Sequence, residues 1–445
     1  MKRPLSPRSR RLRPIARLWK WLSPGLHVKR WLLLSTIGIG LLIIGVAILA
    51  RLTPVLLLSR LIGAIVDGLV ALMPWPVSGT LAIAGGLALL WFGQRRFLGS
   101  ITQVLMPDGD EELVDVLINH HKLNRGAKIV AIGGGTGLST LLRGLKNYSA
   151  NITAIVTVAD DGGSSGRLRR EHGVLPPGDI RNCLAALADE EKLLTELFQY
   201  RFQVGEGLSG HSFGNLFLTA MSDITGDLER AVTASSQVLA VRGRVLPATL
   251  EQMVLWADMA DGRHVEGESQ ISAARGRIVQ IGCYPEQPRA VPQSVEDIRE
   301  AEYILIGPGS LYTSIIPNLL VPEIRSALLH RTVPCVYVCN IMSQVGETDG
   351  FAVSDYVRVL DEVAGGRIFD LVLVQKRLPS ERAIAQYQRA GAHFTQLDRE
   401  VLAALHCPTL VADVMIEDGE KGTIRHDSQR LAGVLMRWYN RQKRA

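Results

Sequence analysis

The chain has 445 residues, of which 47% are hydrophobic and 21% charged, so it can fill the cores of two or three folded parts. The formal net charge of +6 is unevenly spread: ten Lys and Arg and no Asp or Glu lie within residues 1–30, and removing these ten from the 49 basic residues leaves 39 against 43 acidic ones. A generally basic surface for nucleic acid is therefore excluded, and we expect residues 1–30 to form a cytoplasmic tail that faces anionic lipid. The five cysteines lack C-x-x-C or zinc spacing, which indicates buried reduced thiols.

Two apolar segments follow the basic tail and predict a two-span membrane hairpin over residues 31–94. Residues 31–50 contain no charge and are long enough to cross a hydrocarbon core, and a second span is expected over residues 77–92. The connector carries Arg60 and Asp67 on one helical face, which is typical of an interfacial segment. The distribution of basic residues predicts an inner (plasma) membrane protein whose two termini and main domain are cytoplasmic. A cleaved signal peptide is the weaker alternative, because the apolar run is too long and a second one follows.

After a linker over residues 95–126, residues 127–445 predict an α/β domain. Apolar runs of strand length alternate with helical patterns, which favours a Rossmann-like, doubly wound and mostly parallel sheet. From about residue 242 to residue 292 the pattern changes to β-like alternation with a hairpin turn at Asp261-Gly262, so a small antiparallel insertion is expected. The runs that predict parallel strands are AKIVAIG, ANITAIVTV, AEYILIG, TVPCVYVCN and FDLVLVQ.

Three loops fall at the carboxyl ends of predicted parallel strands, where open α/β sheets bind ligands. The first loop is rich in glycine and opens a helix, which lets a phosphate approach backbone amides and the positive helix end. Its spacing is neither the dinucleotide fingerprint, because Leu138 stands where a glycine is needed, nor a P-loop, because no G-K-[ST] follows. The ligand-binding residues predicted here are Gly134, Gly135, Thr136 and Gly137.

The second loop, in VTVADDGGSSGRLR, places two carboxylates before two glycines, and its chemistry has two interpretations. Asp160 lies close to the distance at which a dinucleotide fold places its ribose-binding acid. The same carboxylates could instead hold Mg²⁺ beside a phosphate, together with Asp179, whose alternative role is to cap the following helix. The candidate residues are Asp160, Asp161, Gly162, Gly163, Asp179, Arg181 and Asn182; Asp160, Asp161 and Asp179 are the tentative metal ligands, and Asp160 and Asp161 the candidate catalytic residues.

The third loop, GPGSLYTS, again presents amides and hydroxyls at the start of a helix. Asn340 ends the next predicted strand and is expected to lie nearby. In SGHSFGN, His211 and Asn215 stand one helical turn apart, and a structural role for His211 is as well supported as a ligand contact. The ligand-binding residues predicted from these segments are Gly307, Gly309, Ser310, Thr313, Ser314, Asn340, His211 and Asn215.

Together these motifs, with LPPGDIRNCL, VRGRVLP and VYVCNIMSQVGETDGF, resemble the gluconeogenesis factor (YvcK-like) family of the CofD-like, 2-phospho-L-lactate transferase superfamily, in a membrane-anchored form. The resemblance implies a Rossmann-like fold and a UDP-sugar ligand such as UDP-N-acetylglucosamine. It also implies a regulatory role in cell shape and cell-wall precursor supply during gluconeogenic growth. Near family positions, Tyr387 and Arg425 are candidates for stacking on a base and pairing with a phosphate.

The resemblance leaves catalysis open. The transferase relatives use carboxylates that hold Mg²⁺, and Asp160, Asp161 and Asp179 match that acidic motif. No base or nucleophile stands out, which favours a binding regulator over a phospholactate-type transferase with a nucleotide diphosphate donor. An NAD-dependent oxidoreductase is disfavoured by the missing fingerprint. Membrane lipid, a second copy of the chain and an unknown protein are the further partners considered.

Overall fold

The computed structural model divides the chain into two compact units, residues 1–121 and residues 122–445. In the first unit it describes residues 37–42, 45, 48–49, 53–72, 76–77, 79–81, 83–89, 92–93 and 121; in the second, residues 122–443 apart from 189–190, 206 and 419–421.

The first unit corrects the membrane prediction. Its helix α3 (Thr53–Leu72) covers the segment expected to be the connector, and it carries Arg60 and Asp67 in its interior. Charged side chains oppose insertion into hydrocarbon. Of the predicted spans, residues 31–50 lie mostly outside the described part of the chain, and residues 77–92 are described as short helical pieces. Among the described residues no helix combines the length and the apolar character that a membrane crossing requires, so the predicted two spans and inner-membrane location are contradicted.

A seven-stranded parallel sheet forms the centre of the second unit, in the order β10-β9-β8-β7-β1-β2-β3. Its central strands are continuous apolar runs because both faces are covered by helices. This confirms the predicted α/β, Rossmann-like, mostly parallel fold. The strands are β1 (Ile129–Gly133), β2 (Ile152–Val156), β3 (Arg244–Pro247), β7 (Tyr303–Ile306), β8 (Cys335–Val338), β9 (Leu371–Gln375) and β10 (Thr409–Ala412).

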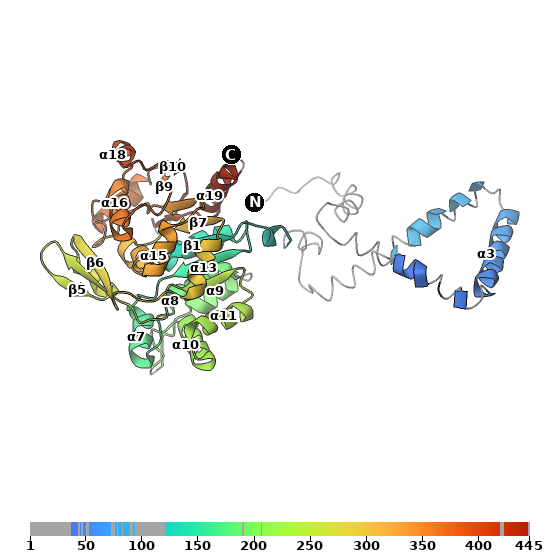
Figure 1. Ribbon diagram of the computed structural model, residues 1–445, viewed down its shortest axis with the longest axis horizontal. Helices are drawn as coiled ribbons and strands as arrows, with labels where there is room; N and C mark the ends of the chain where they lie inside the picture. Colours follow the sequence, from blue (N-terminus) through green and yellow to red (C-terminus); the bar gives the residue numbers. More distant parts are fainter. Residues whose placement is uncertain are drawn as a thin grey trace. The chain divides into compact units, whose positions relative to one another are not determined.

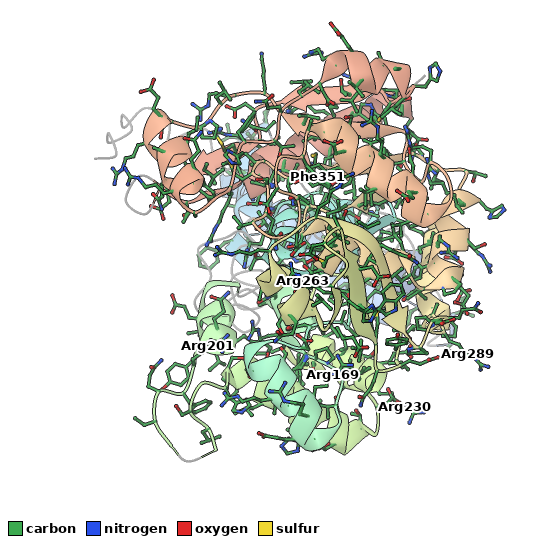
Figure 2. The ribbon with its side chains drawn as sticks, turned by 90° about the vertical axis from the view of Figure 1, so that its left-hand side faces the viewer. Arg169, Arg201, Arg230, Arg263, Arg289 and Phe351 are labelled. Carbon is green, nitrogen blue, oxygen red and sulfur yellow. The ribbon has the colours of Figure 1, made fainter. Side chains whose placement is uncertain are left out.

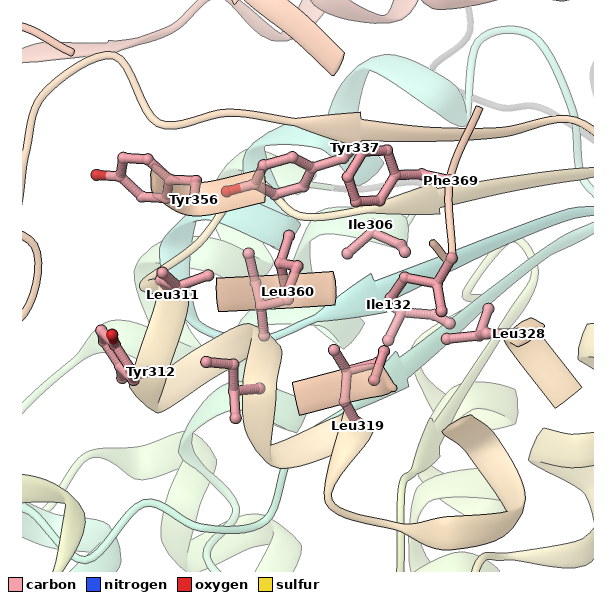
Figure 3. Close-up of a cluster of buried hydrophobic side chains, with 14 of the residues drawn as sticks. Ile132, Ile306, Leu311, Tyr312, Leu319, Leu328, Tyr337, Tyr356, Leu360 and Phe369 are labelled. Atoms are coloured by element: carbon pink, nitrogen blue, oxygen red, sulfur yellow. The ribbon is translucent and has the colours of Figure 1, made fainter. Parts of the chain in front are cut away.

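Successive strand residues point to opposite faces, so each strand contributes to two cores. Ile132 and Ile306 pack on one face against Leu319 and Leu360 from its covering helices (Figure 3). That face is covered by α13 (Pro292–Glu300), η2 (Leu311–Ile315), α14 (Ile316–Leu319), α15 (Pro322–Leu329), α16 (Val353–Ala364) and α18 (Arg399–Ala404). The other face is covered by α6 (Gly135–Leu145), α8 (Gly178–Leu187), α10 (Phe213–Thr225), α11 (Leu228–Val238) and α19 (Ser428–Gln442).

The predicted antiparallel insertion is present as a three-stranded sheet in the order β5-β4-β6, yellow in Figure 1. It contains β4 (Val254–Met259), β5 (His264–Glu266), α12 (Glu268–Ala274) and β6 (Ile278–Tyr284). Helix α7 (Gly163–His172), which carries the Arg169 labelled in Figure 2, is tied to the start of this sheet, because Arg169 donates a hydrogen bond at 2.8 Å to the carbonyl of Met253, the residue before β4.

A second antiparallel pair, β11 (Met415–Glu417) and β12 (Ile424–His426), was not expected from the sequence. It packs with α17 (Glu381–Arg389) around a separate small core of Ile341, Ala383, Met415 and Ile424. We call this pair of strands and α17 the C-terminal lobe. The lobe carries both Tyr387 and Arg425, and so it places two predicted ligand residues together.

Candidate functional site

A cavity of about 910 Å³ opens at the carboxyl ends of β1, β7 and β8, in the sheet position where doubly wound folds bind ligands. The segments that follow these strands form its floor, α6 forms one wall, and the C-terminal lobe forms another. Its many polar lining residues, which follow several different strands, suit a polar ligand that spans several strand ends. It is lined by residues 134–137, 139–140, 143, 182, 196, 199, 308–310, 314, 340–342, 344, 387 and 424–426.

The first glycine loop has conformational and packing reasons for its composition. Gly135 has φ of 63°, a backbone conformation that glycine adopts without strain. A Cβ at Gly137 would lie 2.3 Å from the Pro308 carbonyl oxygen, so only glycine lets the first and third loops approach this closely. Helix α6 begins at Gly135, and the amides of Thr136 and Gly137 in its first turn therefore lie at the cavity between the two loops.

The third loop is held in place by side chains that follow β8. The side-chain amide of Asn340 forms hydrogen bonds with both the N–H and the carbonyl of Gly309. Ser310 donates to Gln344, whose Nε2 donates in turn to Glu347 at 2.6 Å. Burial raises the pKa of Glu347, and Ser272 of the insertion also donates to it, at 2.9 Å. The buried Glu347 carboxyl group therefore holds Gln344, and through it Ser310 of the third loop, in place.

The C-terminal lobe is fastened internally beside the cavity. The Tyr387 hydroxyl accepts a hydrogen bond from the Ile424 backbone N–H at 3.0 Å, which ties α17 to β12. This fixes the strand that carries Arg425, which also lines the cavity. His426 lines it too, and burial lowers its pKa to about 4, so its imidazole is neutral. The lobe thus offers an aromatic ring, a cation and a neutral imidazole.

The predicted acidic residues lie beside the cavity rather than in its lining. Asp179 is in the first turn of α8, not at its N-cap, which is Pro177. A Cβ at Gly134 would lie 2.6 Å from Asp179 Oδ2, so this carboxyl packs directly behind the first loop. Asp160 Oδ1 accepts from the Gly162 N–H at 2.9 Å. Asp161 Oδ1 accepts from the Ser269 N–H at 2.8 Å, at the start of α12.

Burial and mutual repulsion perturb these carboxyl groups. Burial, reinforced by the Asp160 charge, raises the pKa of Asp179 to about 6, against the opposing hydrogen bond from the Gly135 N–H. Burial and the charges of Asp160 and Asp161 likewise raise the pKa of Glu268 to about 8. In the described part of the chain, no three Asp, Glu, His or Cys side chains are grouped so that they could hold a metal ion. A Mg²⁺ role for Asp160, Asp161 and Asp179 stays a prediction, because Mg²⁺ is often held by one or two carboxylates together with phosphate oxygens and water.

The structure gathers about half of the predicted ligand residues in the cavity lining and places the others around it. Arg181, His211 and Asn215 belong to a hydrogen-bonded network behind α8, while Thr313 donates to Glu347 at 3.3 Å. Lining the cavity are Gly134, Gly135, Thr136, Gly137, Asn182, Gly309, Ser310, Ser314, Asn340, Tyr387 and Arg425. Outside its lining are Asp160, Asp161, Gly162, Gly163, Asp179, Arg181, His211, Asn215, Gly307 and Thr313.

Sequence reasoning missed several lining residues. Arg143 shares a face of α6 with Thr136 and Thr140 at helical spacing, and this periodicity could have identified it. Gln344 lies in the same non-helical segment after β8 as the predicted Asn340, four residues beyond it. The residues missed without any local signal are Glu196, Gln199, Met342, Ile424 and His426, which tertiary packing brings to the cavity.

Comparisons with known proteins agree with this architecture. The sequence model of the family described as 2-phospho-L-lactate transferase CofD matches residues 129–415. A Nostoc sp. protein named as a gluconeogenesis factor is 60% identical and aligns over 97% of this chain and 95% of its own. The Bacillus subtilis gluconeogenesis factor is 48% identical over 69% of this chain and 97% of its own. A crystal structure of a Bacillus halodurans protein, 46% identical, covers 70% of this chain and 100% of its own, with a TM-score of 0.68.

Proposed function

Because the chain belongs to the gluconeogenesis factor family of CofD-like proteins, we propose that its cavity binds a nucleotide sugar and that the protein acts as a regulator. The expected ligand is a UDP-sugar such as UDP-N-acetylglucosamine. The expected role is in cell shape and cell-wall precursor supply during gluconeogenic growth. The observation that carries the proposal is the convergence of two glycine loops, Tyr387 and Arg425 on one cavity.

The chemistry of a nucleoside diphosphate matches the order of groups along the cavity. The amides of Thr136 and Gly137 in the first turn of α6 suit a phosphate. Arg425 suits a second phosphate oxygen, because a guanidinium donates two parallel hydrogen bonds. The Tyr387 ring offers a base the flat surface on which it can stack. These three contacts fit a nucleotide lying across the ends of β8, β7 and β1.

Calorimetry on the full chain tests the binding. We expect heat of binding with UDP-N-acetylglucosamine and with UDP, and a weaker response or none with a purine nucleotide sugar. Arg425→Ala should weaken UDP binding at least tenfold, whereas Arg389→Ala, which removes an exposed arginine of the same lobe, should leave it unchanged. Absence of heat and of thermal shift with every UDP-sugar would sink the proposal.

Growth measurements test the regulatory role. A strain that lacks the gene should lose normal cell shape on a gluconeogenic carbon source and regain it with the intact gene. The Arg425→Ala variant should fail to restore shape at equal protein level, because the ligand contact is lost. If this variant restores cell shape, ligand binding in the cavity is not needed for the cellular role.

A transferase that uses a nucleotide diphosphate donor is the second candidate, because the matching family description names 2-phospho-L-lactate transferase. The residues to test are Asp160 and Asp161, the two acids of the second loop. Product formation from a nucleotide diphosphate donor that disappears in Asp161→Asn would establish this activity. Ligand binding without turnover in either protein would leave the regulator as the better description.

A further inference from the structure

Asn182 occupies a distinct end of the cavity. It lies on α8, which packs against α6 and beside β2 and β3, whereas Tyr387 and Arg425 come from the lobe that follows β9 and β10. The first glycine loop follows β1, between these two sides of the sheet. A nucleotide whose base lies on Tyr387 and whose diphosphate lies at the start of α6 therefore extends its remaining group toward Asn182.

The orientation of the Asn182 amide is fixed by its neighbour. Arg181 Nη2 donates to Asn182 Oδ1 at 3.1 Å. A guanidinium has only donors, so the amide oxygen must be the atom that faces it. The amide nitrogen, with its two N–H donors, is then the atom that can donate to a ligand in the cavity.

Arg181 is itself held by a buried network, so the amide cannot reverse without breaking it. Its Nη1 donates to Ser212 Oγ at 2.6 Å and to Asn215 Oδ1 at 3.1 Å. Asn215 Nδ2 donates in turn to Ser164 Oγ at 3.1 Å. Ser212 and Asn215 are almost fully buried, which excludes water as a competing partner for these groups.

We propose that Asn182 reads the sugar end of the ligand, as a hydrogen-bond donor to a sugar oxygen, and that Arg181 positions it for this task. The inference rests on the proposed nucleotide-sugar function and identifies the residue that distinguishes the sugar nucleotide from the nucleotide alone. It also gives the SGHSFGN segment a role: its Ser212 and Asn215 hold the arginine that orients the amide.

The test compares UDP-N-acetylglucosamine with UDP in calorimetry on the full chain. Asn182→Ala should weaken the sugar nucleotide about tenfold, the loss of roughly one hydrogen bond, and leave UDP within twofold. Asn182→Asp keeps the shape but replaces donors with acceptors and adds a negative charge, so it should weaken the sugar nucleotide further. Asn440→Ala, at an exposed position of α19, is the matched control and should change neither affinity.

The outcomes separate this inference from the function on which it rests. If the unmodified protein binds neither UDP nor any UDP-sugar, the proposed function fails. If it binds both and the Asn182 variants weaken UDP as much as the sugar nucleotide, or weaken neither, the role of Asn182 is wrong and the function stands. Melting temperatures of all variants are measured alongside, and Asn182→Asp supplies the comparison if Asn182→Ala folds poorly.

Discussion

The side-chain amide of Asn340 makes two hydrogen bonds with the backbone of Gly309: Oδ1 accepts from the Gly309 N–H at 3.3 Å, and Nδ2 donates to the Gly309 carbonyl at 2.8 Å. The two residues lie 31 positions apart, after neighbouring strands of the sheet. One asparagine thereby fixes the glycine loop that faces the start of α6. A loop held in this way needs little reordering when an anion binds.

Two substitutions at Asn340 should separate its structural contribution from its effect on the ligand. Asn340→Ala removes both hydrogen bonds and should lower the free energy of unfolding by about 2 kcal/mol. Asn340→Asp keeps the acceptor for the Gly309 N–H but places a negative charge beside the proposed phosphate site, so UDP affinity should fall more than stability. Urea unfolding and calorimetry measure the two effects. An aspartate variant that binds UDP normally would contradict the phosphate placement.

The contact between the two glycine loops predicts different outcomes for two neighbouring glycines. A Cβ at Gly137 would lie 2.3 Å from the Pro308 carbonyl oxygen, which is backbone and cannot rotate away. A Cβ at Gly133 would lie 3.7 Å from its nearest atom, which is ordinary contact. Gly137→Ala should therefore abolish nucleotide binding and lower the melting temperature by several degrees, while Gly133→Ala changes both far less. Equal effects of the two changes would refute the close approach of the loops as the cause.

Local patterns in the sequence were sufficient for most of the fold. The apolar runs predicted the parallel strands because these strands are buried on both faces, and the turn at Asp261-Gly262 predicted the antiparallel insertion. The glycine loops were placed correctly at the strand ends because Gly135 and Gly137 satisfy local conformational and packing demands. Ligand roles for these residues remain predictions.

The sequence patterns predicted membrane spans wrongly and did not predict contacts between segments that lie far apart in the chain. Residues 31–50 and 77–92 contain no charged side chain, which suggested two spans, yet the helix α3 between them contains Arg60 and Asp67. Nothing local to Asp161 revealed that the Ser269 N–H, 108 residues away, donates to it, and the ligand role of Asp161 stays a prediction. Glu196 and His426 reach the cavity from segments that lie far apart in the chain. Such contacts depend on topology and leave no periodic signal.

The bond between Asp161 and Ser269 predicts a structural role for this carboxylate. Asp161→Ala removes the acceptor for the Ser269 N–H in the first turn of α12 and should cost about 1 kcal/mol of stability. Asp161→Asn keeps an oxygen acceptor and should cost less. Asp223→Ala, at an exposed position of α10, is the matched control and should be neutral. Urea unfolding measures the stability of the three variants. If Asp161→Ala is as stable as the unmodified protein, the hydrogen bond from Ser269 to Asp161 contributes nothing to stability.

The burial of Asp179 behind Gly134 predicts a pH dependence that differs in sign from that of an ordinary salt-bridged aspartate. Its pKa in the folded protein is raised from 3.8 to about 6, first by burial and then by the Asp160 charge. Between these two values the folded state binds a proton that the unfolded state does not, so this group makes the protein more stable as the pH falls from about 7 toward 4. Asp179→Asn should remove this dependence and, at pH 8, should raise stability by up to about 3 kcal/mol.

The same carboxylate should oppose a phosphate at the first loop when it is ionised, because it lies directly behind Gly134 and accepts a hydrogen bond from Gly135. UDP affinity should therefore rise as the pH falls through about 6, and Asp179→Asn should show high affinity with little pH dependence over this range. Calorimetry at about pH 5.5, 6.5 and 7.5 measures the UDP affinity of both proteins. Since the phosphate of UDP itself titrates in this range, the comparison of the two proteins carries the argument. Parallel pH profiles in the two would mean that Asp179 is not the group that the phosphate senses.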